Sequence, residues 1–459
     1  MMTVQEAARA LHAEWCGEDA LFTGVSTDSR TVAPGDLFVA LVGKNFDGRE
    51  FVASAKAKGA VAAMVHQESG VRSQESDISV IRVEDTRLGL GQLAAYWRGR
   101  FSLPLVAVTG SNGKTTVKEM IASILRQAVG GTDSADRVLA TEGNLNNDIG
   151  VPQMLLRLRA QHAYAVIEMG MNHAGEIAYL TGLAKPAVAL VNNAGAAHLE
   201  GLGSVEAVAH AKGEIFGGLD QQGVAVINAD DIYAALWRKL AGNRQIVDFG
   251  LAGNTQVSAR YRCHPLDSEM TLMLPGGNEE VKLQAPGVHN VRNALAAAAV
   301  AAAMGIGKEI IAAGLNQFKG VKGRMQKKSC LHGATLIDDT YNANPESVRA
   351  ALAVLAAFPG KKFMVLGDMG ELGEGAAALH GDIGEEARRA GIDRLFALGE
   401  LSTHAVAKFG ADARHFERIE ELLAEVENLL APDVTLLVKG SRFMQMERVV
   451  KSFEVPSCC

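Results

Sequence analysis

The 459-residue sequence is poor in cysteine, with five scattered residues and no Cys-x-x-Cys pair. That excludes a disulfide framework, argues against a zinc site and fits a reducing cytosol. Long apolar runs are also missing, because the most apolar stretch, 294–304, is mostly alanine and shorter than the ~20 residues that span a bilayer. The N-terminal segment carries Glu6 and Glu14 instead of the basic and apolar regions of an export signal. We therefore expect a cytoplasmic protein without integral membrane association.

Neither sign of charge is in large excess, since 45 Lys and Arg against 52 Asp and Glu give a net charge of -7. Phosphate neutralisation needs a basic surface, so no nucleic-acid partner is expected. Hydrophobic residues make up 48% and charged residues 21%, which is ordinary for a globular protein and excludes a disordered or fibrous chain. At roughly 150 residues per domain, the length predicts about three domains.

A phosphate-binding loop is the strongest signal in the sequence. The apolar run 105–109 has the length of a strand and leads directly into Gly110-Ser-Asn-Gly-Lys-Thr-Thr116, after which apolar residues recur with helical spacing. Backbone N–H groups of such a loop cradle phosphates, while Lys114 reaches the outer phosphates and a threonine hydroxyl binds magnesium. Position 108 is valine where the common form has glycine, so this is a shortened G-x-x-G-K-T form. The pattern predicts an ATP or GTP site.

Polar residues follow two further apolar runs of the middle third. The run 163–167 ends at Glu168, and the run 186–191 leads to His198. Ligands bind at the carboxyl ends of strands in open α/β sheets, so both side chains are candidates to face the same crevice as Lys114. Taken singly, a solvated glutamate and a hydrogen-bonded loop histidine are the commoner explanations.

A helix is predicted over 204–216, with Ser204 as its N-cap. Lys212 lies within this helix. On its own it is more simply explained as a surface lysine, since lysines are rarely buried.

The outer thirds both read as α/β structure. The first third mixes short apolar runs with helical patterns, and its polar clusters around Ser29-Arg30 and Asp47-Gly48 are explained by turns alone. In the last third, apolar runs alternate with helical patterns, which is typical of a doubly wound domain. There Asp339 ends a predicted strand, and Asn344-Pro345 suits an N-cap followed by proline at the first helical position.

Several spaced motifs together resemble the Mur ligases, the ATP-dependent amide-bond synthetases of peptidoglycan precursor assembly. The motifs are Thr109–Thr115, Glu168-Met-Gly, His198 after Asn192-Asn193, Lys212-Gly-Glu-Ile-Phe, His289-Asn-Val-Arg-Asn293, Gly323-Arg-Met-Gln326 and Asp338–Pro345. Within the family, the segments 143–152, 339–345 and 366–373 look like those of the member that adds D-alanyl-D-alanine to UDP-N-acetylmuramoyl-tripeptide. The Asp-Asn-Pro-Arg motif of the diaminopimelate-adding relative is absent.

The resemblance implies three α/β domains. These are a small N-terminal domain for the UDP-sugar-peptide (1–104), a central ATP-binding domain of the P-loop type (105–322) and a C-terminal Rossmann-like domain that contacts the dipeptide and ATP (323–459). It also implies ATP and two Mg²⁺ ions, with an acyl phosphate as the intermediate. A monomer is expected.

Residue roles follow from the same resemblance. The expected catalytic residues are Lys114, Glu168, His198, Lys212 and Arg324, with Lys212 carbamylated. The expected metal ligands are Thr115, Glu168, His198 and Lys212. The expected nucleotide contacts are Thr109, Gly110, Ser111, Asn112, Gly113, Lys114, Thr115, Thr116, Asn290, Asn293, Arg324 and Asp339. The expected contacts to the sugar-peptide are Ser29, Arg30, Asp47, Gly48, Thr141, Asn144, Asn146 and Asn147.

Two alternatives stay open. One is a folylpolyglutamate synthase, a relative with a similar loop and the same acyl-phosphate chemistry, against which the first third with Asp28-Ser-Arg30 speaks. The other is a P-loop kinase or a nucleotide-regulated binding protein. The third residue of the tripeptide and the groups that grip the dipeptide are not predicted. Glu371 and His380 occupy suggestive loops, but solvated side chains explain them as well.

Overall fold

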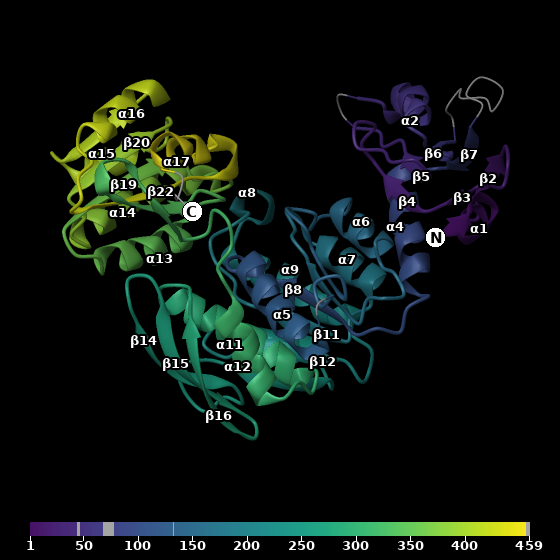
Figure 1. The fold of residues 1–459 in the computed structure, drawn as a ribbon, viewed down its shortest axis with the longest axis horizontal. Helices are drawn as coiled ribbons and strands as arrows, with labels where there is room; N and C mark the ends of the chain where they lie inside the picture. The colour runs from purple at the N-terminus through teal and green to yellow at the C-terminus, as the bar shows by residue number, and fades with distance from the viewer. Residues whose placement is uncertain (44–45, 68–77, 132, 456–459) are drawn as a thin grey trace.

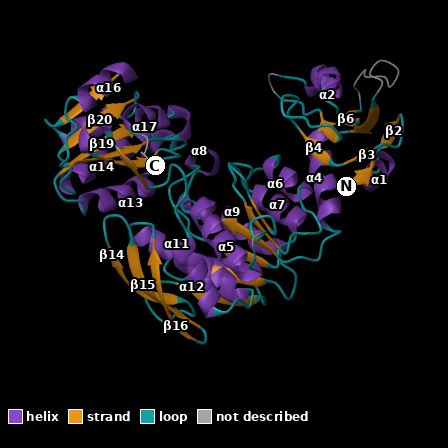
Figure 2. Cartoon of the chain, in the orientation of Figure 1, coloured by secondary structure: helices purple, strands orange, loops and turns teal. Residues whose placement is uncertain are grey.

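The computed structural model describes residues 1–43, 46–67, 78–131 and 133–455. Three domains follow one another along the chain, and Figure 1 shows the N-terminal and C-terminal domains at opposite ends of the central one. Each is built on a β-sheet with helices packed against it (Figure 2). The expected three-domain α/β architecture is confirmed, while the limits 1–104, 105–322 and 323–459 stay a prediction.

The N-terminal domain contains a five-stranded sheet in the order β2-β7-β6-β5-β4, parallel except for the edge strand β2, and a two-stranded ribbon of β1 and β3. Its elements are β1 (Met2–Thr3), α1 (Val4–Ala10), β2 (Glu14–Cys16), β3 (Leu21–Phe22), β4 (Gly24–Ser26), β5 (Asp36–Val39), the 3-10 helix η1 (Gly48–Phe51), α2 (Val52–Ala57), β6 (Ala62–His66), β7 (Ser79–Val83) and α4 (Thr86–Arg98).

Helix α4 joins this domain to the central one. Its N-terminus is capped by Asp85, whose carboxylate accepts the N–H groups of Arg87 and Leu88. Farther along the helix, a Cβ on Gly91 would lie 1.9 Å from the Tyr179 hydroxyl, so the helices of the two domains approach closely there. The N-terminal domain is thus packed directly on the central one.

The central domain contains a six-stranded parallel sheet in the order β13-β12-β11-β8-β10-β9. The chain leaves β8 to one side for β9 and β10 and then returns to the other side for β11, so the loop after β8 lies where the strand order reverses. The elements are β8 (Leu105–Thr109), α5 (Lys114–Val129), β9 (Val138–Ala140), α6 (Gly150–Leu156), β10 (Tyr164–Glu168), α7 (Glu176–Ala184), β11 (Val188–Val191), α8 (Leu199–Leu202), α9 (Val205–Gly213), the 3-10 helix η2 (Glu214–Gly218), β12 (Val224–Asn228), α10 (Ala234–Ala241) and β13 (Gln245–Phe249).

A three-stranded antiparallel sheet completes the central domain and was not predicted. It consists of β14 (Ser258–Cys263), β15 (Ser268–Leu274) and β16 (Gly277–Leu283), and it is followed by α11 (Val288–Ala303) and α12 (Lys308–Gln317). Met270, Leu272 and Leu274 alternate inward along β15. The alanine-rich stretch of the sequence lies in α11, where small side chains allow the buried helix to pack between α5 and the sheets.

The C-terminal domain contains a six-stranded sheet in the order β17-β18-β22-β19-β20-β21, parallel except for β17. Asn344 caps α13 with Pro345 at its first position, as expected, and Ser347 completes a capping box. The elements are β17 (Gln326–Ser329), the 3-10 helix η3 (Leu331–Gly333), β18 (Thr335–Asp339), α13 (Pro345–Ala356), β19 (Lys361–Gly367), the 3-10 helix η4 (Gly373–Gly375), α14 (Ala376–Arg389), β20 (Arg394–Leu398), α15 (Thr403–Phe409), β21 (Ala413–Phe416), α16 (Ile419–Glu427), β22 (Val434–Lys439), the 3-10 helix η5 (Arg442–Met444) and α17 (Glu447–Phe453).

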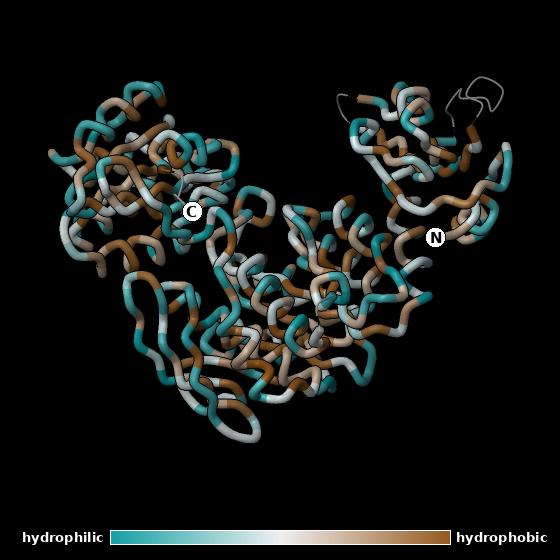
Figure 3. The backbone as a smooth tube through the Cα atoms, in the orientation of Figure 1, coloured by the Kyte–Doolittle hydropathy of each residue, from teal (hydrophilic) through white to brown (hydrophobic). Residues whose placement is uncertain are grey.

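Hydrophobic side chains form a core on each face of the three main sheets, and one of these cores is continuous from the N-terminal into the central domain. Figure 3 shows the hydrophobic segments running through the interior of the domains. Among the described residues, no helix is both long and apolar enough to cross a membrane. Cys16, Cys263 and Cys330 are free thiols, and Cys458 and Cys459 lie outside the described residues.

Candidate active site

The phosphate loop between β8 and α5 is held by the loop that follows β11. The N–H of Ser111 donates to the Asn193 carbonyl oxygen at 3.0 Å, and the N–H of Asn112 donates to Asn193 Oδ1 at 2.8 Å. Gly113 has a φ of +79° and a Cβ there would lie 2.3 Å from Asn293 Oδ1, so this position requires glycine. Strands β8 and β11 are neighbours in the sheet, and this pairing brings residues about 80 positions apart into contact here.

Lys114 begins α5 and folds back over the loop. Its Nζ donates to the Gly110 carbonyl oxygen at 2.6 Å. Burial lowers the pKa of Lys114, while the nearby carboxylate of Glu168 raises it, Arg324 lowers it and Glu371 raises it. The Lys114 ammonium is therefore close enough to interact electrostatically with all three groups. Two of them, Arg324 and Glu371, belong to the C-terminal domain.

Glu168 ends β10 and is 2% exposed. Its Oε1 accepts a hydrogen bond from Asn146 Nδ2 at 2.8 Å, and its backbone N–H donates to Thr141 Oγ1 at 2.9 Å. Its Oε2 is buried and has no hydrogen-bond partner among the described residues. A buried carboxylate oxygen without a donor is costly, so this atom fits a cation at the site.

Thr141 and Asn146 therefore support Glu168 directly. Asn144 and Asn147, which were also expected at the sugar-peptide, make no hydrogen bond to Glu168 in the described structure. Asn147 Oδ1 accepts the N–H of Gly150 at 2.8 Å, at the start of α6, while Asn144 is exposed. All three polar groups of Thr141 are used, because its N–H donates to the Val166 carbonyl and its own carbonyl accepts from Lys118 Nζ at 2.6 Å.

Replacement of Lys118 should weaken this support. The side chain is 2% exposed and lies one turn after Lys114, where it pairs with Glu119 and binds the Thr141 carbonyl. Lys118→Met leaves that buried carbonyl without its donor, and we expect the free energy of unfolding to fall by about 1–3 kcal/mol. Urea denaturation followed by tryptophan fluorescence measures this. Glu119→Gln is the control, with an expected change below about 1 kcal/mol because Glu119 is one-third exposed; equal effects of both variants would contradict the argument.

His198 meets the C-terminal domain through Glu371. Both residues adopt left-handed backbone conformations, with φ of +59° and +61°, and His198 Nδ1 lies 2.8 Å from Glu371 Oε2. The pairing with His198 lowers the pKa of Glu371. The loop of Glu371 is fixed by His380, whose Nε2 accepts the N–H of Met369 at 2.9 Å. Glu371 is thus paired across the domain interface, and His380 is a buried structural residue rather than a solvated one.

A magnesium site is compatible with this arrangement, but the protein side chains would supply only part of the ion's ligands. Within the part of the chain that the structure describes, no three His, Cys, Asp or Glu side chains are grouped closely enough to hold a metal ion by themselves. Magnesium commonly keeps several waters and takes one or two carboxylates plus substrate phosphates. The unpartnered oxygen of Glu168 and the hydroxyl of Thr115, 8% exposed at the start of α5, fit such a partial ligand set.

Lys212 is not the surface lysine that its position in a helix suggests. The expected helix over 204–216 ends at Gly213 as α9 and continues as the 3-10 helix η2, and Ser204 caps it as expected. Gly213 lies against Trp237 and Leu240 of α10, where a Cβ would be 2.3 Å from a Leu240 methyl carbon. Lys212 is 1% exposed, and burial, followed by repulsion from Lys114, lowers its pKa well below the usual value.

Arg324 crosses from the C-terminal domain to the phosphate loop. Its Nη2 donates to Thr115 Oγ1 at 3.2 Å, and its guanidinium carbon lies 4.2 Å from the ring centre of Tyr341. The arginine is therefore held by stacking on its own domain while it reaches the loop of the central domain. This is a more specific environment than that of a surface arginine.

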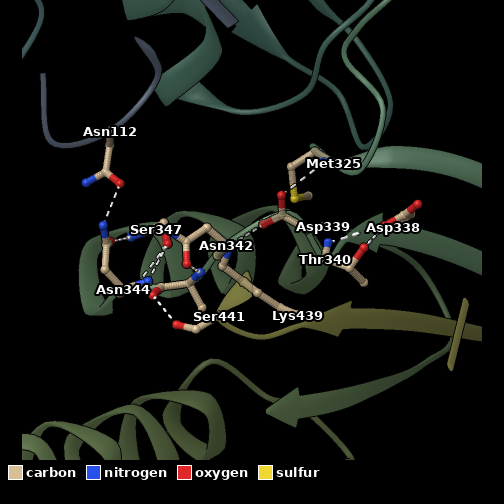
Figure 4. A network of polar contacts seen from close by, with 11 residues as sticks. Asn112, Met325, Asp338, Asp339, Thr340, Asn342, Asn344, Ser347, Lys439 and Ser441 are labelled. Carbon is tan, nitrogen blue, oxygen red and sulfur yellow. Dashed lines mark hydrogen bonds and ion pairs between the residues drawn. The ribbon is translucent and has the colours of Figure 1, made fainter. Parts of the chain in front are cut away.

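Asp339 is fixed by a lysine that the sequence analysis missed. Its Oδ2 accepts from Lys439 Nζ at 2.6 Å and its Oδ1 accepts the N–H of Met325 at 3.1 Å (Figure 4). Lys439 is 2% exposed and also donates to the Asn342 carbonyl. The signal was present, because Lys439 ends an apolar strand-length run just as Asp339 does, and parallel neighbours β22 and β18 bring the two ends together.

A cavity of about 420 Å³ lies between the central and C-terminal domains. Its lining residues include Asn112, Gly113 and Thr116 of the phosphate loop, His289, Asn290 and Asn293 of α11, and Arg324 and Asp339 of the C-terminal domain. A chain of amides stabilises its wall, since Asn293 Nδ2 donates to Asn290 Oδ1 at 3.2 Å and Asn192 Nδ2 donates to Asn293 Oδ1 at 3.1 Å. Burial lowers the pKa of His289 to about 4, so this ring is neutral at physiological pH.

The predicted N-terminal contacts lie elsewhere, and none of them lines this cavity. Arg30, with its side chain 86% exposed, pairs with Asp28 at 2.7 Å, and this hydrogen bonding lowers the pKa of Asp28 to about 2. Asp47 pairs with Arg49, and the hydrogen bond from Arg49 lowers the pKa of Asp47. Ser29 is half-buried, and a Cβ on Gly48 would lie 2.6 Å from the Leu41 carbonyl oxygen. A substrate that contacts both these N-terminal residues and the cavity must extend along the molecule.

Known proteins match the chain over its whole length. Residues 21–98 match the Mur ligase family catalytic domain, 108–301 the Mur ligase middle domain and 323–442 the Mur ligase glutamate ligase domain. The UDP-N-acetylmuramoyl-tripeptide--D-alanyl-D-alanine ligase of Escherichia coli (strain K12) is 44% identical over 100% of this chain and 99% of its own. Crystal structure I of MurF from Acinetobacter baumannii has a TM-score of 0.91 at 38% identity, covering 98% of both chains. The MurF ligase from Thermotoga maritima in complex with ADP has a TM-score of 0.82 at 29% identity, covering 95% of this chain and 98% of its own.

Proposed function

This chain belongs to the Mur ligase family, and we propose that the junction of its central and C-terminal domains is where it joins D-alanyl-D-alanine to UDP-N-acetylmuramoyl-tripeptide. It is an ATP-dependent peptide ligase of peptidoglycan precursor synthesis, as its full-length identity to ligases of that name and its similarity to an ADP-bound relative support. The observation that carries the proposed location is the gathering of Lys114, Glu168 and Arg324 from distant parts of the chain around one phosphate loop.

Amide formation in water requires the carboxylate oxygen to become a leaving group. The tripeptide carboxylate attacks the γ-phosphorus of ATP and forms an acyl phosphate with release of ADP. The dipeptide amine then attacks the acyl carbon, loses a proton, and phosphate leaves. Negative charge accumulates in both steps, so preorganised cations stabilise the transition states. In this proposal Lys114 and Arg324 hold the transferred phosphoryl group, because Lys114 folds back over its own loop and Arg324 reaches that loop from the C-terminal domain.

The nucleotide occupies the cavity between the two domains in this proposal. Residues 109–116 cradle the phosphates, Asn290 and Asn293 contact the nucleotide from the central domain, and Asp339, fixed by Lys439, binds the ribose. Thr115, Glu168, His198 and Lys212 would hold two Mg²⁺ ions, which when bound would neutralise phosphate charge. The support for this is the unpartnered oxygen of Glu168 and the repulsion that Lys114 exerts on buried Lys212.

The UDP-sugar end of the substrate binds the N-terminal domain in this proposal. Ser29, Arg30, Asp47 and Gly48 contact the nucleotide-sugar, while Thr141, Asn144, Asn146 and Asn147 line the path of the tripeptide toward Glu168. The two groups lie at adjoining segments, because Gln153 of α6, the helix that begins after Asn147, donates to Thr27 Oγ1 of the N-terminal domain at 2.5 Å. We further propose that the protein works as a monomer in the cytoplasm, with the small-molecule substrates as its partners.

Phosphate release tests the function. The purified protein should release phosphate from ATP only when both UDP-N-acetylmuramoyl-tripeptide and D-alanyl-D-alanine are present, because the acyl phosphate needs an acceptor amine to turn over. A coupled phosphate assay with each substrate omitted in turn measures this. Equal turnover with a single free amino acid would reject the dipeptide assignment, and release without any amine would favour a nucleotide hydrolase.

A further inference from the structure

The start of helix α13 contacts two loops of the central domain. Asn344 Nδ2 donates to Asn112 Oδ1 in the phosphate loop at 2.8 Å (Figure 4). Two residues farther on, Glu346 Oε1 accepts the N–H of Ala196 at 2.9 Å. A Cβ on Gly195 would lie 3.2 Å from the Glu346 carboxyl carbon, so the chain approaches closely here. The first turn of α13 is thus seated on the central domain by side-chain contacts.

Asn344 uses both ends of its amide. The oxygen caps α13 by accepting the N–H of Ser347 at 2.9 Å, and the Asn344 N–H donates in return to Ser347 Oγ at 3.0 Å. The cap therefore fixes which way the amide points and leaves its NH₂ group for Asn112. Serine, threonine and aspartate cap helices about as well as asparagine, but none of them supplies a side-chain N–H at this reach. Capping alone does not account for asparagine at this position.

The receiving residue is also held in place. The backbone N–H of Asn112 donates to Asn193 Oδ1, and its carbonyl accepts from Asn192 Nδ2 at 2.9 Å and from Asn193 Nδ2 at 3.1 Å. Since both backbone groups are fixed, the side chain of Asn112 marks the position of the phosphate loop. A hydrogen bond between two such oriented amides defines the separation of the two domains more sharply than an ion pair between long, exposed side chains would.

We propose that Asn344 is a positioning residue that sets how the C-terminal domain sits over the phosphate loop. Arg324 and Asp339 belong to the same domain, so this seating also sets where they meet the nucleotide. The inference rests on the proposed function for its kinetic consequence, but the seating itself is a property of the protein alone. A neutral hydrogen bond of this kind corresponds to an effect of about five- to tenfold.

Asn344→Ser is the test variant, because serine keeps the N-cap but is too short to reach Asn112. Ser347→Ala is the matched control, because it removes the other half of the capping box and leaves the interdomain bond. Energy transfer between dyes attached through unnatural amino acids at exposed Lys239 and Lys408 reports the distance between the domains. We expect Asn344→Ser to broaden that distance distribution and to lower kcat/KM for D-alanyl-D-alanine about five- to tenfold, whereas the distance distribution of Ser347→Ala should match that of the unmodified protein.

A double-mutant cycle with Asn112→Ala separates the contact from other effects. If the hydrogen bond is responsible, the double variant is no worse than the more impaired single variant, whereas additive losses would overturn the proposal. A distance distribution unchanged by Asn344→Ser would overturn it as well. If that variant fails to fold, the distance distribution of Asn112→Ala tests the same bond from the loop side. An unmodified protein that releases no phosphate with both substrates would reject the proposed function instead, while the distance measurement would still decide the role of Asn344.

Discussion

Glu168→Gln is expected to lower kcat for ligation by about 100- to 1,000-fold, the range seen when one preorganised electrostatic group is removed from a transition state. Glutamine keeps the size of the side chain, and its oxygen can still accept the hydrogen bond of Asn146. Its NH₂ group then takes the place of the buried, unpartnered Oε2 and presents a donor where the geometry calls for a cation. The change therefore removes the charge without removing the packing.

A binding measurement separates this effect from a general loss of structure. Mn²⁺ can replace Mg²⁺ in the assay, and electron paramagnetic resonance with ADP present measures how much of the ion is bound. We expect weaker Mn²⁺ binding in Glu168→Gln and a thermal midpoint close to that of the unmodified protein. Asn146→Ala serves as the control, because it leaves the carboxylate charged and only loosens it, with an expected loss of about tenfold. Full activity of Glu168→Gln would show that this carboxylate holds no ion needed for the reaction.

The parts of the site that the sequence predicts best are those in which local structure and chemistry coincide. The loop after β8 is visible because strand, glycine loop and helix follow one another without a gap, and Gly113 is needed there for steric reasons as well. The cap formed by Asn344 and Pro345 could be predicted for the same reason. In both cases the decisive interactions lie within a few residues along the chain.

The parts that escaped prediction depend on long-range pairing. Lys439 lies 100 residues from Asp339, and only the parallel pairing of β22 with β18 brings their side chains together. The three-stranded sheet β14–β16 was missed because its half-exposed strands alternate polar and apolar residues and lack the continuous apolar runs of the buried strands. Burial is equally a property of the whole fold, and for this reason Lys212 could be mistaken for a surface residue.

Resemblance supplied roles that neither spacing nor burial could. Thr141 and Asn146 were expected at the sugar-peptide, and the structure shows in addition that they support Glu168. The two roles are compatible, because a residue that orients the carboxylate can also face the tripeptide that arrives beside it. The contact of Glu371 with His198 was beyond reach, since it depends on how the C-terminal domain sits on the central one.

Lys212→Ala is expected to lower ligase activity by at least about 100-fold, and short carboxylic acids such as formate or acetate should restore part of it. The side chain is 1% exposed, and burial together with the Lys114 ammonium favours its neutral amine. The amine nitrogen can attack carbon dioxide, forming a nitrogen–carbon bond and losing a proton, and the resulting carbamate is an anion. This exchanges the repulsion between Lys114 and Lys212 for attraction, and it supplies an oxygen ligand suited to magnesium.

Labelled bicarbonate tests this chemistry directly, since a ¹³C resonance of a carbamate should appear in the unmodified protein and be absent from Lys212→Ala. Lys212→Arg is the matched control for rescue, because arginine keeps a cation, fills the space and forms no carbamate. Formate should therefore restore activity to Lys212→Ala and leave Lys212→Arg inactive. Activity of Lys212→Ala that stays within a few fold of the unmodified protein would reject a catalytic role for the anion. A lasting loss without rescue and without a carbamate signal in the unmodified protein would instead leave Lys212 as a buried amine needed for packing.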